Sequence, residues 1–144
     1  MSEKRIRFAI PGEPVGKGRP RFVMATGRTF TPEKTATYEN LVKLEYERQC
    51  SGDLFAPPEM LRMEIRAYYG IAASDSKKKR QLKVRGIIRP IKRPDCDNIG
   101  KIIADALNGL AYRDDAQIVE MLVEKRYGET PRVEVEISTI VEGG

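Results

Sequence analysis

Histidine and tryptophan are both absent from this 144-residue chain. Without histidine there can be no Ser-His-Asp triad, no Cys-His dyad, no histidine ligand for zinc and no histidine general base. Any enzymatic chemistry must therefore use carboxylates, lysines, tyrosines or a metal ion. The lack of tryptophan and an aromatic content of 7% leave few side chains for reading bases, so contacts to a nucleic acid would follow its backbone and shape.

Cysteines and long apolar runs are also scarce. Two cysteines, Cys50 and Cys96, do not form a disulfide framework. No run of about 18 apolar residues is present, so we expect no membrane span and no membrane partner. The opening MSEKRIRFAI lacks the apolar core of a signal peptide, which predicts a cytoplasmic protein. The length predicts a single domain, residues 1–144.

Positive charge is concentrated in one part of the chain. The net charge is +5, but residues 77–101 hold ten Lys or Arg against two Asp, a local sum of +8. Such a block indicates a polyanionic partner, and the alternative is a solvated charged face. A second basic stretch, PGEPVGKGRPRF at 11–22, is rich in glycine and proline and predicts a loop that contacts phosphates.

The apolar pattern predicts an α/β protein of the α+β kind. Alternation of apolar and polar residues predicts strands at 5–10, 60–70, 117–127 and 132–140. Helical spacing and capping residues predict helices at 31–48 and 97–107, and 74–85 is either a short basic helix or a disordered loop. The short GETP connection between the last two strands predicts a hairpin.

Two carboxylates are crowded in RPDCDNIGK, residues 93–101. Asp95 and Asp97 stand two positions apart, and two such charges about 4 Å apart repel by about 4 kcal/mol at an effective dielectric near 20. A bound cation, a raised pKa or separation into solvent could offset this repulsion. On a helical wheel Asp97 shares one face with Lys101, Asp105 and Asn108, opposite an apolar face.

Less specific interpretations of this face exist. The charges could form helix ion pairs worth about 0.3–0.5 kcal/mol each, and Asp97 could be an N-cap. Asp95 precedes the predicted helix, and neither interpretation gives it a role. A second acidic pair, Asp114-Asp115, follows the helix, but about ten helical residues could separate Asp115 from Asp95 by some 15 Å.

A dimer or a tilted strand could bring the acidic pairs together. Three carboxylates without histidine would then make a hard oxygen site that favours Mg²⁺, with Mn²⁺ as the alternative. Such a site suits phosphodiester hydrolysis, and Lys101 would neutralise transition-state charge or position the attacking water.

The stretch RPDCDNIGKIIADALNGLAYRDDAQI, residues 93–118, resembles the RusA family of Holliday-junction resolvases. The shared pattern is D-x-D-N-x-x-K, then D-A-L, then D-D-A-Q. The glycine-rich basic opening and the SKKK segment are similar to bacterial and phage members. One departure from some relatives is a shorter loop between Leu107 and Asp114, which bears on substrate preference.

The resemblance implies both a site and an activity. It places metal-binding catalytic aspartates at Asp95, Asp97 and Asp115 and a functional lysine at Lys101, with Asp105 and Asp114 at other acidic positions of the pattern. It implies a small mixed sheet with two to three helices packed on it. It also implies a magnesium-dependent homodimer that cuts four-way DNA junctions by paired nicks.

These observations support three hypotheses. The first is a metal-dependent, structure-selective endonuclease. The second is a non-catalytic basic DNA-binding module, and the third is a nucleotide phosphohydrolase. In the first, the residues expected to bind DNA phosphates are Lys17, Arg19, Arg21, Lys77, Lys78, Lys79, Arg80 and Arg93.

Overall fold

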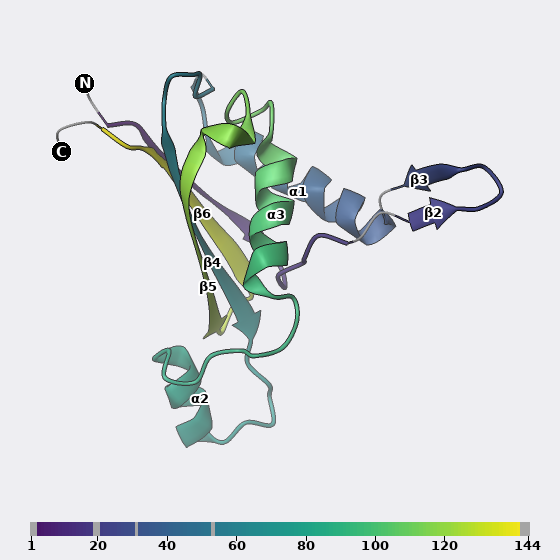
Figure 1. Cartoon of the computed structure of the whole chain (residues 1–144). Coiled ribbons are helices and arrows are strands. Elements are labelled where there is room, and N and C mark those ends of the chain that lie inside the picture. The colour runs from purple at the N-terminus through teal and green to yellow at the C-terminus, as the bar shows by residue number, and fades with distance from the viewer. Residues whose placement is uncertain (1–2, 19–20, 31, 53, 142–144) are drawn as a thin grey trace.

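A four-stranded mixed sheet forms the centre of the protein (Figure 1). The structure, a computed structural model, describes residues 3–18, 21–30, 32–52 and 54–141, without the side chains of 21–23 and 30. The sheet order is β1-β6-β4-β5, with β4 parallel to β5 and antiparallel to β6, and β6 antiparallel to β1. The strands are β1 (Arg5–Pro11), β4 (Leu61–Gly70), β5 (Ile118–Gly128) and β6 (Arg132–Thr139). The expected α+β fold is confirmed.

The core lies between one face of this sheet and two helices. On β4, the alternating residues Leu61, Met63 and Ile65 are fully buried, as the period of two predicts. The helices α1 (Glu33–Gln49) and α3 (Cys96–Leu107) contribute side chains to the same hydrophobic cluster. This packing fixes α3 beside β5, where the candidate site lies.

The predicted hairpin between the last two strands is wrong. β5 and β6 run in opposite directions and are joined by only residues 129–131, but β4 lies between them. Parallel strands need a long crossover, and residues 71–117 provide one from β4 to β5. Because β4 is an interior strand, its second edge also needs hydrogen-bond partners, and β6 supplies them.

Two smaller elements extend from this body (Figure 1). A two-stranded hairpin, β2 (Arg21–Val23) and β3 (Arg28–Phe30), occupies part of the stretch expected to be a basic loop. Residues 74–85, for which a short helix and a disordered loop were both considered, contain the helix α2 (Lys77–Val84). Its N-cap Ser76 accepts a hydrogen bond from the Lys79 N–H at 3.1 Å. Among the described residues, no helix is long and apolar enough to cross a membrane.

Candidate active site

The start of α3 is held by a cap and by a buried tyrosine. The Asp95 side chain is the N-cap and accepts a hydrogen bond from the Asn98 N–H at 3.0 Å. The buried Tyr69 hydroxyl on β4 donates to the Pro94 carbonyl oxygen at 2.8 Å. Burial, and then the nearby Cys96, Glu13 and Asp95, raise the pKa of Tyr69, so its hydroxyl keeps the proton that it donates. The segment that carries Asp95 is therefore fixed to the sheet.

The N-cap finding corrects the interpretation of the paired aspartates. Asp97 lies in the first turn of α3 and is not the cap. Asp95, which was expected to precede the helix without capping it, is the N-cap. Capping accounts for an aspartate at position 95. It leaves the exposed Asp97 without a structural role among the described contacts.

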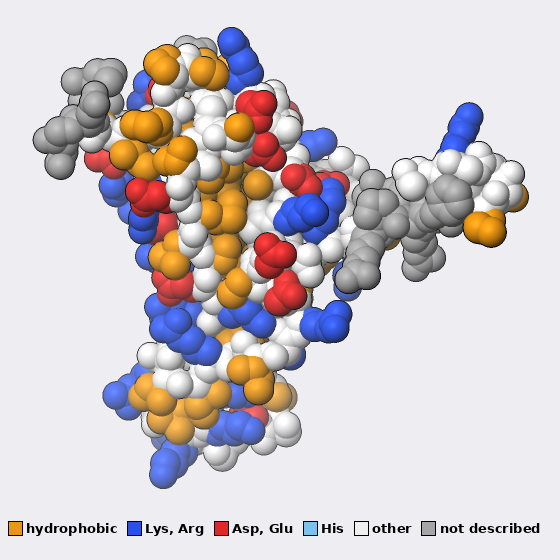
Figure 2. Space-filling view, viewed as in Figure 1, with side chains coloured by type: hydrophobic (Ala, Val, Ile, Leu, Met, Phe, Trp, Pro, Cys, Tyr) orange, Lys and Arg blue, Asp and Glu red, His pale blue; other side chains and the backbone are white. Residues whose placement is uncertain are grey.

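One polar face of α3 forms a wall of a groove of about 640 Å³. The predicted stripe of Asp97, Lys101 and Asp105 lines this groove together with Asp115. Its other wall belongs to β5, at Met121, Leu122 and Val123. Figure 2 shows apolar side chains between β5 and α3, with acidic side chains beside them.

Gly100 allows this wall to approach β5 closely. A Cβ atom there would lie 2.8 Å from the Met121 sulfur and 3.3 Å from a Val123 methyl carbon. Glycine in a helix interior costs about 1 kcal/mol relative to alanine, so close packing is the physical reason for it. The absence of a side chain at Gly100 thereby lets α3 and β5 lie close together along the groove.

A short capped turn fixes Asp115. The 3-10 helix η1 (Asp115–Gln117) begins after Asp114, whose side chain accepts from the Ala116 N–H at 2.9 Å. The Gln117 side chain accepts from the Asp114 N–H at 3.1 Å, completing a capping box. The Asp115 N–H donates to the Asn108 side-chain oxygen at 3.1 Å, which ties Asp115 to the end of α3.

Three of these positioning residues were not predicted from the sequence: Gln117, Asn108 and Tyr69. The D-x-x-Q spacing of Asp114 and Gln117 is a capping-box signal that could have been found. Asn108 was placed on the polar stripe, but no local pattern shows that its side chain accepts from Asp115. The bond between Tyr69 and Pro94 likewise joins residues far apart in sequence, so nothing local indicates it.

The predicted metal set is not gathered at one point within one chain. Asp97 and Asn108 lie at opposite ends of α3, about 16 Å apart by the helical rise. Asp95 faces a second groove, of about 680 Å³. Among the described residues, no three His, Cys, Asp or Glu side chains are close enough to share a metal ion. The set Asp95, Asp97 and Asp115 therefore stays a prediction.

Negative charge is nevertheless crowded around Asp115. Burial, a hydrogen bond with Asp114 and the charges of Asp114 and Asp105 together raise its pKa. A cation beside these carboxylates would relieve their repulsion. The donors along this groove are carboxylate oxygens, which suit Mg²⁺ or Mn²⁺.

The lysines of the two grooves differ in their partners. Lys17 lies 2.9 Å from Glu39 and 3.2 Å from Asp105. Burial lowers the pKa of Lys17, but its hydrogen bonds to these two carboxylates outweigh burial, so the pKa is raised. Lys101 is exposed and makes no ion pair with a described carboxylate, so the alternative interpretation of this face as a ladder of helix ion pairs is wrong. Its charge remains available to a phosphate.

The other residues expected to contact DNA are dispersed. Lys77, Lys78 and Lys79 are exposed on α2, and Arg80 lies 3.5 Å from Glu129. Arg93 lines the second groove beside Asp95. Arg19 lies outside the described residues, and Arg21 is described only by its backbone, in β2.

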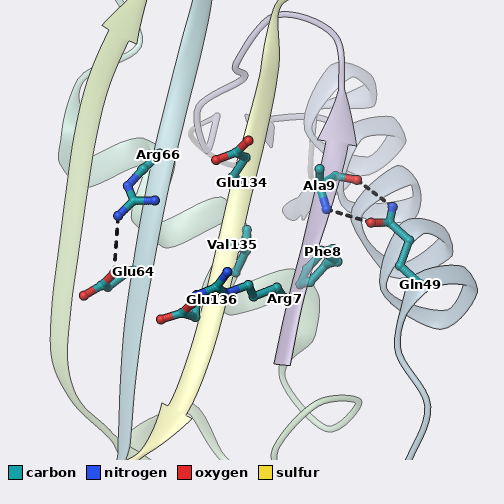
Figure 3. Close-up of a pocket in the computed structure, with 9 residues that line it drawn as sticks. All are labelled: Arg7, Phe8, Ala9, Gln49, Glu64, Arg66, Glu134, Val135 and Glu136. Atoms are coloured by element: carbon teal, nitrogen blue, oxygen red, sulfur yellow. Dashed lines mark hydrogen bonds and ion pairs between the residues drawn. The ribbon is translucent and has the colours of Figure 1, made fainter. Parts of the chain in front are cut away.

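A third pocket, of about 350 Å³, lies away from the acidic motif (Figure 3). Its lining includes Glu64, Arg66 and Glu136, from the sheet face opposite the buried side chains of β4. At its rim Gln49 exchanges two hydrogen bonds with the Ala9 backbone, at 2.9 and 2.7 Å, and so covers part of the edge strand β1. We assign this pocket to sheet structure.

Comparison with known proteins decides the family. The sequence model of the family described as endodeoxyribonuclease RusA matches residues 11–138. The chain belongs to the RusA endodeoxyribonuclease family. It is also 37% identical over 139 residues to the uncharacterized protein YqaN of Bacillus subtilis (strain 168), covering 94% of this chain and 96% of that protein.

Family membership settles the class of activity. This RusA protein is an endodeoxyribonuclease of the Holliday-junction-resolving type, and its substrate is branched DNA. The matched region contains both grooves, α3 and the Asp114-Asp115 pair.

Proposed function

We propose that this RusA protein is a magnesium-dependent, structure-selective endonuclease that resolves four-way junctions by paired nicks. The observation that carries the proposal is the polar face of α3, which places Asp97, Lys101 and Asp105 along one groove with Asp115. A non-catalytic module would need the basic residues but not this row of carboxylates. The third hypothesis, a nucleotide phosphohydrolase, fits poorly, because the groove is open and the basic residues lie over an extended surface.

In this proposal Asp95, Asp97 and Asp115 hold Mg²⁺, or Mn²⁺ in its place, once the dimer brings the separated carboxylates of two copies together. When bound, the metal would activate water and stabilise the leaving oxygen of the phosphodiester. Lys101 contacts the scissile phosphate and neutralises charge that develops on it. Asp95 remains the α3 cap and is thereby held rigidly, since a carboxylate has acceptor capacity beyond one backbone hydrogen bond.

A homodimer is the second part of the proposal. β5 is an edge strand, and its residues Val119, Met121 and Leu122 are exposed apolar side chains. An exposed apolar edge strand favours pairing with another chain. A second copy packed there would cover this patch, bring its own carboxylates close to the groove and present two sites to one junction.

Cleavage of synthetic DNA tests the activity. A labelled four-way junction and a linear duplex of the same arm sequence are incubated with the protein, with and without Mg²⁺. We expect symmetric nicks in the junction only when Mg²⁺ is present, and intact linear duplex. Junction binding without cleavage in either Mg²⁺ or Mn²⁺ would instead support the non-catalytic module.

A further inference from the structure

The segment between β4 and α3 carries an exposed apolar tip on a basic lobe. We define the α2 lobe as residues 71–94, which include α2 and lie at one end of the sheet (Figure 1). Val84 is 52% exposed, Ile87 is 60% exposed and Ile91 is 100% exposed. A fully exposed isoleucine presents apolar surface that a binding partner can cover, and we call Ile91 the tip of this lobe.

We propose that Ile91 is a wedge that inserts into the branch point of the DNA junction and holds its bases unstacked. This inference rests on the proposed function and adds the group that distinguishes branched from linear DNA. Proteins that kink or open DNA commonly insert apolar side chains, isoleucine among them, between base steps.

The charge around the tip identifies DNA as its partner. Residues 77–93 contain nine Lys or Arg and no Asp or Glu. Three of these cations pair with carboxylates: Lys79 and Lys83 with Asp75, and Arg80 with Glu129. The other six have no described carboxylate in ion-pairing range, and they are Lys77, Lys78, Arg85, Arg89, Lys92 and Arg93. An exposed apolar residue within a segment of unpaired cations complements bases flanked by phosphates.

The tip is also close to the candidate active site. Ile91 precedes Asp95 by four residues, so their Cα atoms are at most about 14 Å apart. A DNA strand advances about 3.4 Å per nucleotide, so this span is about four nucleotides. An inserted Ile91 therefore lies within a few nucleotides of a strand that passes Asp95. Unstacking costs least where stacking is already interrupted, as at the branch point of an open four-way junction, so insertion there costs less than in a continuous duplex.

Several contacts hold the lobe in place on the sheet. The Lys83 ammonium is ion-paired with Asp75 and lies 4.4 Å from the centre of the Tyr127 ring on β5. The Lys125 ammonium, also on β5, donates to the Lys92 carbonyl oxygen. The N–H groups of Ile87 and Ile88 both donate to the Leu82 carbonyl oxygen, at 3.0 and 3.2 Å. A wedge fixed in this way loses little conformational entropy when it binds.

Fluorescence of 2-aminopurine provides the test. The base is placed next to the branch point of a four-way junction, or in the middle of one arm, and wild-type protein is titrated in without divalent metal. We expect fluorescence to rise at the branch but not in the arm. Ile91→Ser should remove most of this rise and weaken junction binding about tenfold, while binding to linear duplex stays unchanged. Ile91→Leu should retain the rise.

The matched control is Leu44→Ser, which alters an exposed leucine on α1, outside the lobe. This variant should bind and unstack like wild type. Unchanged fluorescence and affinity in Ile91→Ser would overturn the wedge. So would a loss of dimer in gel filtration, because the tip would then be a contact between copies.

Failure of the wedge and failure of the proposed function give different results. If Ile91→Ser matches wild type in binding while wild type still cuts junctions, only the wedge is wrong. If wild type binds and opens the branch but never cuts it with Mg²⁺, the wedge stands and the catalytic proposal fails. If wild type does not open the branch at all, the wedge is wrong whether or not cleavage occurs.

Discussion

Asp115 owes its position to Asn108, whose side-chain oxygen accepts a hydrogen bond from the Asp115 backbone N–H at 3.1 Å. The capping box of Asp114 and Gln117 orients the same turn from its other side. Similar support exists at the other end of α3, where Tyr69 holds Pro94 and the Asn98 N–H orients Asp95. At the residue scale, the carboxylates of the proposed site are therefore held by side chains that need not touch DNA.

Replacing Asn108 by alanine tests this support. We expect Asn108→Ala to lower the junction-cleavage rate about 10–100-fold, the range found when groups that orient metal ligands are lost. Junction affinity measured without metal should remain close to that of wild type, because no phosphate contact is removed. Asn40→Ala, on an exposed position of α1, is the control and should cleave normally. Equal cleavage by the two variants would show that Asn108 does not position Asp115.

The sequence predicted which charged residues share one face of α3, but not how separate segments come together at the site. The stripe of Asp97, Lys101 and Asp105 followed from helical periodicity, and the groove confirms that they share a face. The place of Asp115 depends on a turn after the helix, whose direction a periodic pattern does not determine. The N-cap was assigned two residues too late, because Asp95 and Asp97 are chemically equal candidates.

At the scale of elements, an ion pair within the α2 lobe holds the lysine that packs against β5. Asp75 accepts from the Lys83 ammonium, which also lies over the Tyr127 ring. The hydrogen bond from Lys83 lowers the pKa of Asp75 below its usual value, and the charges of Lys83 and Lys79 act in the same direction. The folded protein therefore gains stability from ionised Asp75 above the usual carboxyl pKa, and this gain is lost as the pH falls through the lowered value.

This linkage predicts a pH-dependent difference between wild type and Asp75→Asn. At pH 7 the variant should unfold at a lower temperature, because Lys83 is left buried without its partner. The difference should shrink as the pH falls below about 4, where Asp75 of wild type becomes protonated as well. Thermal melts across this range measure it.

Glu129→Gln is the control for this experiment, since it breaks an exposed pair with Arg80 in the same lobe. That pair should contribute little at any pH. A melting difference for Asp75→Asn that does not change with pH would contradict the ionic attachment.

The individual strands were easier to predict from the sequence than the way in which they pair in the sheet. The alternating stretches 60–70 and 132–140 became β4 and β6 with almost the expected bounds. The β5–β6 hairpin was wrong because a short connection predicts direct pairing only when no other strand competes for the position. β4, with its buried apolar face, competes here and pairs with both. The β2–β3 hairpin was missed because its strands are only three residues long.

At the scale of the whole molecule, the apolar edge of β5 is expected to join two copies. Leu122 is an exposed residue of this edge strand, is in register with Glu64 of β4, and also borders the α3 groove. Leu122→Lys should therefore shift the protein from dimer to monomer without unfolding it, as measured by light scattering. Leu44→Lys, an exposed leucine on α1, is the control and should remain dimeric. A dimeric Leu122→Lys would place the interface elsewhere.

Catalysis is proposed to depend on a metal ion held in part by the carboxylates of the α3 groove. Single-turnover cleavage of a four-way junction by Asp97→Asn, with Mg²⁺, tests this dependence most directly. We predict a rate more than about a hundredfold below wild type, since metal catalysis supplies several kcal/mol of transition-state stabilisation. Junction affinity should stay equal or become tighter, because a negative charge near phosphate is removed. Cleavage by Asp97→Asn at the wild-type rate would contradict the account.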